Sequence, residues 1–135
     1  MNLIVCLDER DGMLFLGRRQ SQDRVLRSHM LEFAEGNGLW MNAYSARQFE
    51  PGAPITVDEE FLRHAPEDAW CFAENTDLLP HIAKIRKLAI YRWNRHYPCD
   101  TYFPRAEFES RWTQVSTGEF PGSSHDLITQ EVYTL

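Results

Sequence analysis

Two short segments of this chain concentrate side chains that could bind a ligand. One of them directly follows an apolar stretch and consists of Arg92, Trp93, Asn94 and Arg95. Two guanidinium groups, an indole and an amide supply hydrogen-bond donors and flat faces, which suit an anionic or planar ligand. The structural alternative is that Trp93 fills the edge of the core while the arginines pair with carboxylates such as Glu74 or Asp100.

The other segment lies just before and at the start of an expected helix and contains Arg18, Arg19, Gln22 and Asp23. A helix N-terminus favours anions because its first N–H groups are free and the helix dipole is positive there. These residues therefore predict a site for a phosphate or a carboxylate. The alternative is a solvated loop in which Asp23 only stabilises the first helical turn.

Polar groups also follow two further expected strands: Asn42 and Tyr44 after one, Glu74 and Asn75 after the other. In open α/β sheets, ligands commonly bind at the edge formed by the carboxyl ends of the parallel strands. We expect these residues to share that edge with Arg92. Glu74 would form a buried ion pair with Arg92 if their two strands were neighbours.

One further triplet has the residue types of a hydrolytic triad: Ser124, His125 and Asp126. Residues adjacent in sequence rarely converge in that geometry, and the chain has no Gly-x-Ser-x-Gly turn. The triplet is therefore not taken as a catalytic triad. We expect His125 to be a loop residue that hydrogen-bonds the backbone.

The elements that must position these groups follow from the spacing of apolar residues. The expected strands are 3–7, 39–41, 55–57, 70–73 and 87–93, and the expected helices are 21–36, 45–49, 59–62 and 76–85. Ser21 is expected to cap the first helix and Gly36 to end it. Alternating strands and helices predict a parallel sheet flanked by helices.

The C-terminal third changes to a period of two. Two sets of side chains alternate there: Trp112, Gln114 and Ser116, then Ile128, Gln130 and Val132. This pattern predicts a pair of antiparallel strands. The fold class is therefore α/β, a mostly parallel central sheet flanked by helices with a C-terminal antiparallel hairpin, in one domain over residues 1–135.

Composition limits the partners. The chain has 14 Lys and Arg against 20 Asp and Glu, a net charge of −6, which disfavours nucleic acid. It has three widely spaced cysteines, no basic leader and no long apolar run, so we expect a cytoplasmic location and no membrane contact. An uncovered sheet edge would make a homo-oligomer possible.

Several short motifs resemble the dihydrofolate reductase family. They are Gly12-Met13, matching the family's mobile loop, Asp100-Thr101-Tyr102-Phe103-Pro104, Trp112, Glu119-Phe120 and Ser124-His125. The resemblance extends over nearly the whole chain and implies the dihydrofolate reductase fold. It also places Asp23 near the family's acidic residue at the start of its first helix.

The departures from the family concern its NADPH site. Met41-Asn42-Ala43-Tyr44-Ser45 stands where the family has Met-Gly-Arg-x-Thr, and Phe72-Ala73-Glu74-Asn75-Thr76 where it has a Gly-Gly triplet. Part of the family's usual length is also absent between Phe49 and Trp70. Each lost glycine places a Cβ where a pyrophosphate would approach, and Glu74 adds a negative charge. We therefore predict no cofactor.

The chain also resembles small bacterial proteins that carry a ribonuclease Z label. That label implies an H-x-H-x-D-H metal cluster. The five histidines here are isolated from one another: His29, His64, His81, His96 and His125. We predict no metal site and expect the label to be a mistaken transfer.

The leading hypothesis is a protein of degenerate dihydrofolate-reductase-like fold that binds a small anionic molecule or a protein partner. One alternative is a divergent dihydrofolate or pteridine reductase, with Asp23 as proton donor and NADPH as the cofactor. The other is RNA binding by arginines acting together, namely Arg18, Arg19, Arg24, Arg92 and Arg95.

Overall fold

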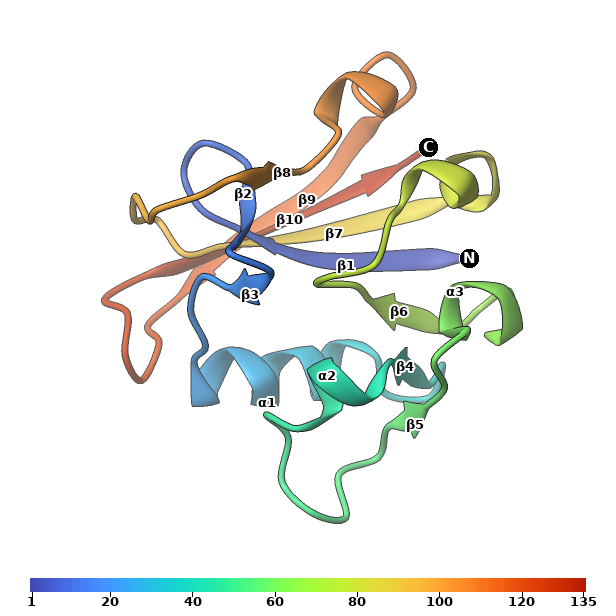
Figure 1. Cartoon of the computed structure of the whole chain (residues 1–135), viewed down its shortest axis with the longest axis horizontal. Helices are drawn as coiled ribbons and strands as arrows, with labels where there is room; N and C mark the ends of the chain where they lie inside the picture. The colour runs from blue at the N-terminus through green and yellow to red at the C-terminus, as the bar shows by residue number, and fades with distance from the viewer.

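A seven-stranded sheet forms the body of the protein in the computed structural model, which describes residues 1–135 (Figure 1). Its order is β5-β4-β6-β1-β7-β10-β9. These strands are β1 (Asn2–Leu7), β4 (Leu39–Met41), β5 (Thr56–Val57), β6 (Trp70–Phe72), β7 (Lys87–Arg92), β9 (Thr113–Phe120) and β10 (Ile128–Thr134). The five from β5 to β7 are parallel, and the β9–β10 hairpin pairs antiparallel with β7. The predicted fold class is confirmed.

Strand β1 lies at the centre of the sheet, between β6 and β7. Successive side chains of a strand point to opposite faces, so Leu3, Val5 and Leu7 pack into one core cluster and Ile4 into the other. Because both faces are covered, the strand needs apolar side chains at successive positions. This burial explains the unbroken apolar run in the sequence.

Helix α1 (Arg24–Phe33) packs its buried side chains, Leu26 and Met30, into the second of these clusters. Its N-cap is Asp23, whereas the sequence pattern predicted Ser21. Asp23 Oδ1 accepts a hydrogen bond from the Leu26 N–H at 3.1 Å. The cap therefore places the Asp23 carboxylate under the first turn of α1.

The other helices are short. Helix α2 (Ala43–Ala46) is capped by Asn42 and begins before the expected 45–49, and α3 is Phe61–His64. The expected helix over 76–85 is only the 3-10 segment η1 (Leu79–Lys84), and η2 is Arg105–Glu107. None of the residues of η1 itself is buried, and the core contacts of this segment come mainly from Leu78 and Ile85 on either side of it. No helix of the chain has the length and apolarity needed to span a membrane.

A second, small sheet was not predicted from the sequence. It has the order β3-β2-β8, formed by β2 (Gly12–Phe15), β3 (Arg18–Arg19) and β8 (Thr101–Tyr102). It lies beside the carboxyl end of β1 (Figure 1). Leu16 and Gly17 make its tight turn with φ values of 51° and 74°. Arg18 and Arg19 therefore lie on a strand instead of in a loop.

Candidate functional site

A buried ion pair with its hydrogen-bond partners, here called the Glu74 cluster, occupies the space between the small sheet, α2 and the end of β6. Its members are Arg19, Tyr44, Ser45, Gln48 and Glu74. Arg19 Nε donates to Glu74 Oε2 at 3.0 Å and its Nη2 to Oε1 at 3.1 Å. The Ser45 hydroxyl and the Gln48 amide also donate to Oε1, at 2.8 and 3.1 Å. The Glu74 side chain is 7% exposed, so Arg19 balances its charge inside the protein.

Tyr44 holds Arg19 in this position. The Arg19 N–H donates to the Tyr44 hydroxyl at 2.8 Å, and Arg19 Nη2 donates to the Tyr44 carbonyl at 3.0 Å. The guanidinium carbon also lies 4.2 Å from the centre of the Tyr44 ring, within the range of a cation–π contact. The donors of Arg19 are thus directed at groups of the protein itself.

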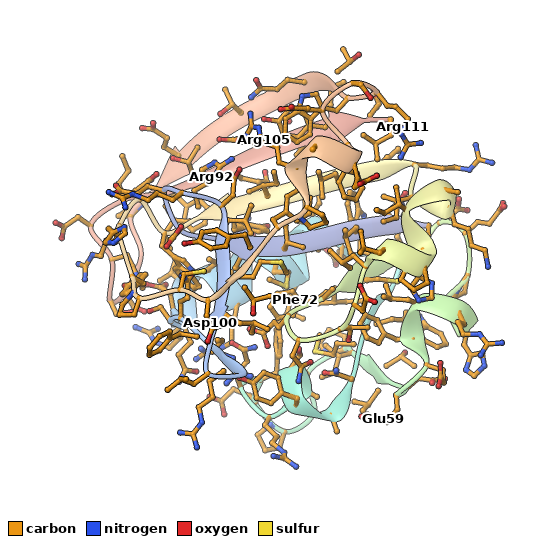
Figure 2. The ribbon with its side chains drawn as sticks, turned by 45° about the horizontal axis from the view of Figure 1, so that its top comes forward. Glu59, Phe72, Arg92, Asp100, Arg105 and Arg111 are labelled. Carbon is orange, nitrogen blue, oxygen red and sulfur yellow. The ribbon has the colours of Figure 1, made fainter.

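The expected pair between Arg92 and Glu74 is absent, because β1 separates the strand before Glu74 from the strand that ends at Arg92. Arg92 donates instead to Asp11 Oδ1 at 2.8 Å and to Glu131 Oε2 at 2.9 Å. Burial lowers the pKa of Arg92, but hydrogen bonds to these two carboxylates outweigh it and raise that pKa. Arg105, near Arg92 in Figure 2, also bonds Asp11.

The remaining residues of the 92–95 segment do not converge on one site. Trp93 is 4% exposed and stacks on His125 with ring centres 4.7 Å apart. The Asn94 amide donates to the Leu127 carbonyl at 3.1 Å. Arg95 is exposed and forms no ion pair. Of the predicted ligand-binding residues in this segment, Trp93 therefore belongs to the core and Arg95 to the surface.

Three other predicted site residues make local contacts. Asn42 accepts from the Ser45 N–H at 3.1 Å as the cap of α2, and its amide donates to Asn75 Oδ1 at 2.9 Å. Gln22 is exposed and accepts from Arg27 at 3.2 Å. Asn42 and Asn75 therefore lie together beside Glu74, whereas Gln22 lies apart from them.

Arg18 differs from Arg19 in being exposed and without an ion-pair partner. It lines a cleft of about 590 Å³, here called the Arg18 cleft. The lining residues are Phe15, Leu16, Arg18, Arg19, Gln20, Tyr97 and Pro98. Phe15 is 41% exposed and Leu16 is 74% exposed. One unpaired cation thus stands beside uncovered apolar and aromatic surface.

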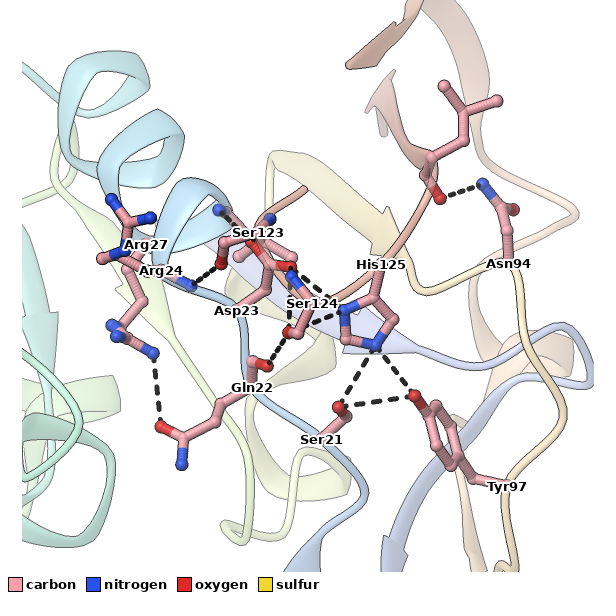
Figure 3. A network of polar contacts seen from close by, with 12 residues as sticks. Ser21, Gln22, Asp23, Arg24, Arg27, Asn94, Tyr97, Ser123, Ser124 and His125 are labelled. Carbon is pink, nitrogen blue, oxygen red and sulfur yellow. Dashed lines mark hydrogen bonds and ion pairs between the residues drawn. The ribbon is translucent and has the colours of Figure 1, made fainter. Parts of the chain in front are cut away.

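A second polar network, here called the Asp23 network, joins the start of α1 to the loop between β9 and β10 (Figure 3). Asp23 Oδ2 accepts from the Ser124 N–H at 2.8 Å and lies 3.1 Å from His125 Nδ1. On the other side of the ring, His125 Nε2 lies 2.8 Å from the Tyr97 hydroxyl and 3.2 Å from the Ser21 hydroxyl. A carboxylate, an imidazole and two hydroxyls are therefore connected in sequence.

Asp23 is ionised in this network. Its burial raises the pKa, but the N–H groups of Ser124 and Ser123, the His125 ring and the Leu26 N–H together hold that pKa far below its usual range. The carboxylate therefore serves as a hydrogen-bond acceptor at neutral pH. A group in this state is poorly suited to donate a proton.

Sequence reasoning assigned His125 to a backbone-bonding loop and did not single out Ser21 as part of a site. The His125 side chain is in fact 1% exposed and contacts the side chains of Asp23 and Tyr97. The glycine at position 122 was one sign of this site in the sequence. In the folded chain an added Cβ there would lie 2.5 Å from Asp23 Oδ2, so only glycine fits over the carboxylate. No group of three or more His, Cys, Asp or Glu residues is arranged to hold a metal ion.

Comparison with solved structures identifies the architecture. Dihydrofolate reductase from Enterococcus faecalis, complexed with NADP(H) and RAB-propyl, aligns with 98% of this chain and 94% of its own, with a TM-score of 0.66. The chain has the dihydrofolate reductase fold. Sequence identity in that alignment is 13%, so the likeness concerns the fold alone. No protein-family model matches the chain, and no curated protein matches it in sequence.

Proposed function

We propose that the protein binds a small organic anion with an apolar body in the Arg18 cleft. The observation that carries this proposal is the contrast among its arginines: Arg19 and Arg92 are held by carboxylates, whereas Arg18 is unpaired at the wall of a cleft. A volume of about 590 Å³ lies within the range of small-molecule sites.

The lining of the cleft indicates the class of ligand. The planar guanidinium of Arg18 suits a carboxylate or a phosphate, which it can hold through two parallel hydrogen bonds. The exposed side chains of Phe15 and Leu16 offer apolar contact beside it. An aromatic carboxylate or an aryl phosphate combines both features.

NADPH does not fit this chain in the manner of its structural relatives. A cleft of about 340 Å³ runs between the small sheet and the loop after β6, and its lining includes Glu74 and Asp77 but no lysine or arginine. Ala73, Glu74 and Asn75 carry side chains where the reductase family has bare glycine backbone. The charge of Glu74 is balanced by Arg19, but Asp77 is exposed on this wall and no cation lies there to offset it, which opposes a diphosphate.

The reductase alternative required Asp23 to donate a proton. The depressed pKa of Asp23 and its complete set of hydrogen bonds favour the carboxylate form instead. RNA binding required five free arginines. Two of them, Arg19 and Arg92, are engaged with carboxylates, which leaves fewer cations for phosphate contacts. Both alternatives are therefore less well supported than binding of a small anion.

Isothermal titration with matched probes tests the proposal. 1-Naphthoate and phenyl phosphate should bind, whereas the uncharged 1-naphthylmethanol should bind more weakly. Arg18→Ala should weaken binding of the anions about 10- to 100-fold, because it removes a charge-assisted pair of hydrogen bonds. Arg24→Ala is the matched control, since Arg24 is also exposed but does not line the cleft.

Two results would overturn the proposal. One is that the unmodified protein binds the charged and the uncharged probes equally tightly, or that Arg18→Ala binds the anions as tightly as the unmodified protein does. The other is micromolar binding of NADPH, together with turnover of dihydrofolate that Asp23→Asn abolishes. That second outcome would restore the reductase alternative and its proton donor.

A further inference from the structure

The Asp23 network contains an ordered set of three side chains brought together from the two ends of the chain. Asp23 Oδ2 lies 3.1 Å from His125 Nδ1, and Ser21 Oγ lies 3.2 Å from His125 Nε2 (Figure 3). A carboxylate on one ring nitrogen and a hydroxyl on the other is the order found in acyl-transfer triads. Such a triad is recognised by geometry and not by position in the sequence.

The hydrogen bonds fix the direction of proton transfer. Asp23 is an acceptor that also takes the N–H groups of Leu26, Ser123 and Ser124, so His125 Nδ1 must donate to it. In that tautomer Nε2 carries a lone pair, and both the Tyr97 hydroxyl and the Ser21 hydroxyl lie within hydrogen-bond distance of it, at 2.8 and 3.2 Å. Stacking of His125 on Trp93, with ring centres 4.7 Å apart, holds the ring in this orientation.

We propose that Ser21 is the nucleophile of a hydrolytic triad with His125 as general base and Asp23 as the group that orients it. The substrate class is a carboxylic ester whose acyl part bears an anionic group. The choice of an anionic acyl part rests on the proposed function of the Arg18 cleft. The triad itself does not depend on it.

Tyr97 connects the triad to the cleft. Tyr97 is among the residues that line the Arg18 cleft, and its hydroxyl lies 2.8 Å from His125 Nε2 and 3.4 Å from Ser21 Oγ. Nε2 can accept only one strong hydrogen bond, and the shorter one is to Tyr97. A bound ester carbonyl would draw the Tyr97 hydroxyl away as a donor to its oxygen. Nε2 is then free to accept the proton of Ser21.

The reaction balances with water as the only co-reactant. Ser21 Oγ attacks the ester carbonyl carbon while its proton passes to His125 Nε2, and the negative oxygen is stabilised by the Tyr97 hydroxyl. The bond to the alkoxy oxygen breaks, and His125 gives its proton to the departing alcohol. Water then attacks the acyl-Ser21 ester with His125 again as base, which releases the carboxylic acid and restores Ser21.

A purely structural role for these residues makes the opposite prediction. In that case the network only fastens the β9–β10 loop to the start of α1, and Ser21 is a minor contact within it. The test must therefore measure chemistry at Ser21 and not only stability. Ser28→Ala is the control, because Ser28 is an exposed serine on α1 outside the network.

The experiment measures hydrolysis of 4-nitrophenyl acetate and of 4-nitrophenyl hydrogen succinate. Ser21→Ala should lower turnover of both esters at least about 100-fold, and Ser28→Ala should leave it unchanged. An alkyl fluorophosphonate should add once to the unmodified protein, with the adduct located on Ser21 by peptide mass spectrometry. Equal rates for the protein and Ser21→Ala, or an adduct located elsewhere, would overturn the triad.

The two proposals fail in different ways. Arg18→Ala should slow hydrolysis of the succinate ester several-fold more than hydrolysis of the acetate ester, because only the succinate ester carries the anionic group that Arg18 would hold. If hydrolysis depends on Ser21 but its rate does not depend on the charge of the acyl group, anion binding by Arg18 is refuted and the triad is retained. Binding of 1-naphthoate that depends on Arg18, without any reaction at Ser21, would retain the cleft and refute the triad.

Discussion

Arg18 and Arg19 are neighbours on β3 and both are lining residues of the Arg18 cleft, yet their guanidinium groups have different partners. Arg19 lies in the Glu74 cluster, where it meets a carboxylate that is 7% exposed, whereas Arg18 faces solvent at the wall of the Arg18 cleft. Adjacent side chains on a strand point to opposite faces, so one residue step separates a structural cation from a free one.

This contrast shows that arginine count alone is a poor guide to an anion site. Carboxylates of the protein itself pair with both partly buried arginines. Glu74 pairs with Arg19, and Asp11 and Glu131 pair with Arg92. A guanidinium in that state has few donors left for a ligand. The free cation of the small sheet is identified by its lack of an ion-pair partner, which no local sequence pattern indicates.

The sharpest way to break the contrast is to remove the carboxylate of the Glu74 cluster. Glu74→Ala leaves Arg19 partly buried without its counter-charge and should lower the free energy of unfolding by about 3–5 kcal/mol. Glu119→Ala, at an exposed position of β9, should change it by less than about 0.5 kcal/mol. Chemical denaturation of both variants provides the measurement. A loss for Glu74→Ala as small as for Glu119→Ala would mean that the cluster is not structural.

The second prediction concerns Asp23 and acid. Its folded-state pKa is depressed, so its ionised form stabilises the protein above the ordinary aspartate pKa of about 3.9, and this stabilisation is lost as pH falls from about 5 toward the folded pKa. Asp8 has a lowered pKa as well and contributes in the same direction.

Asp23→Asn should therefore lower the free energy of unfolding at neutral pH by about 1–3 kcal/mol and flatten its decline in acid. Denaturation curves recorded at a series of pH values check both effects. A variant with the same slope against pH as the unmodified protein would show that Asp23 is not the group that titrates.

The smallest expected effect belongs to Arg18. Arg18→Ala should change the free energy of unfolding by less than about 0.5 kcal/mol, because the side chain is exposed and forms no ion pair. Arg19→Ala, one residue away, should cost several times more. Thermal or chemical unfolding of the pair compares them directly. Equal losses would place both arginines in the structural region and remove the basis for an anion site.

The sheet was largely predictable from local patterns. The apolar run of β1 reflects burial on both faces of the strand. The alternation over 112–116 and 128–132 predicted the two C-terminal strands, although β9 is exposed along nearly its whole length. The small sheet was not predicted, because the first turn residue, Leu16, adopts the left-handed region. Glycine or asparagine at that position is the usual sequence signal for such a turn. The expected helix over 76–85 is reduced to the 3-10 segment Leu79–Lys84, and the buried apolar residues Leu78 and Ile85 lie just outside that segment.

By itself the sequence determined the seven strands of the large sheet and the first helix, the acidic charge balance and the presence of arginines near the ends of strands. Only the tertiary structure decided which carboxylate each arginine meets and that Ser21, Asp23, Tyr97 and His125 come together. The reason is that periodicity reports burial along a local segment, whereas these pairings join residues up to 104 positions apart. They depend on the order of strands in the sheet and on how the two terminal regions pack, which no local pattern encodes.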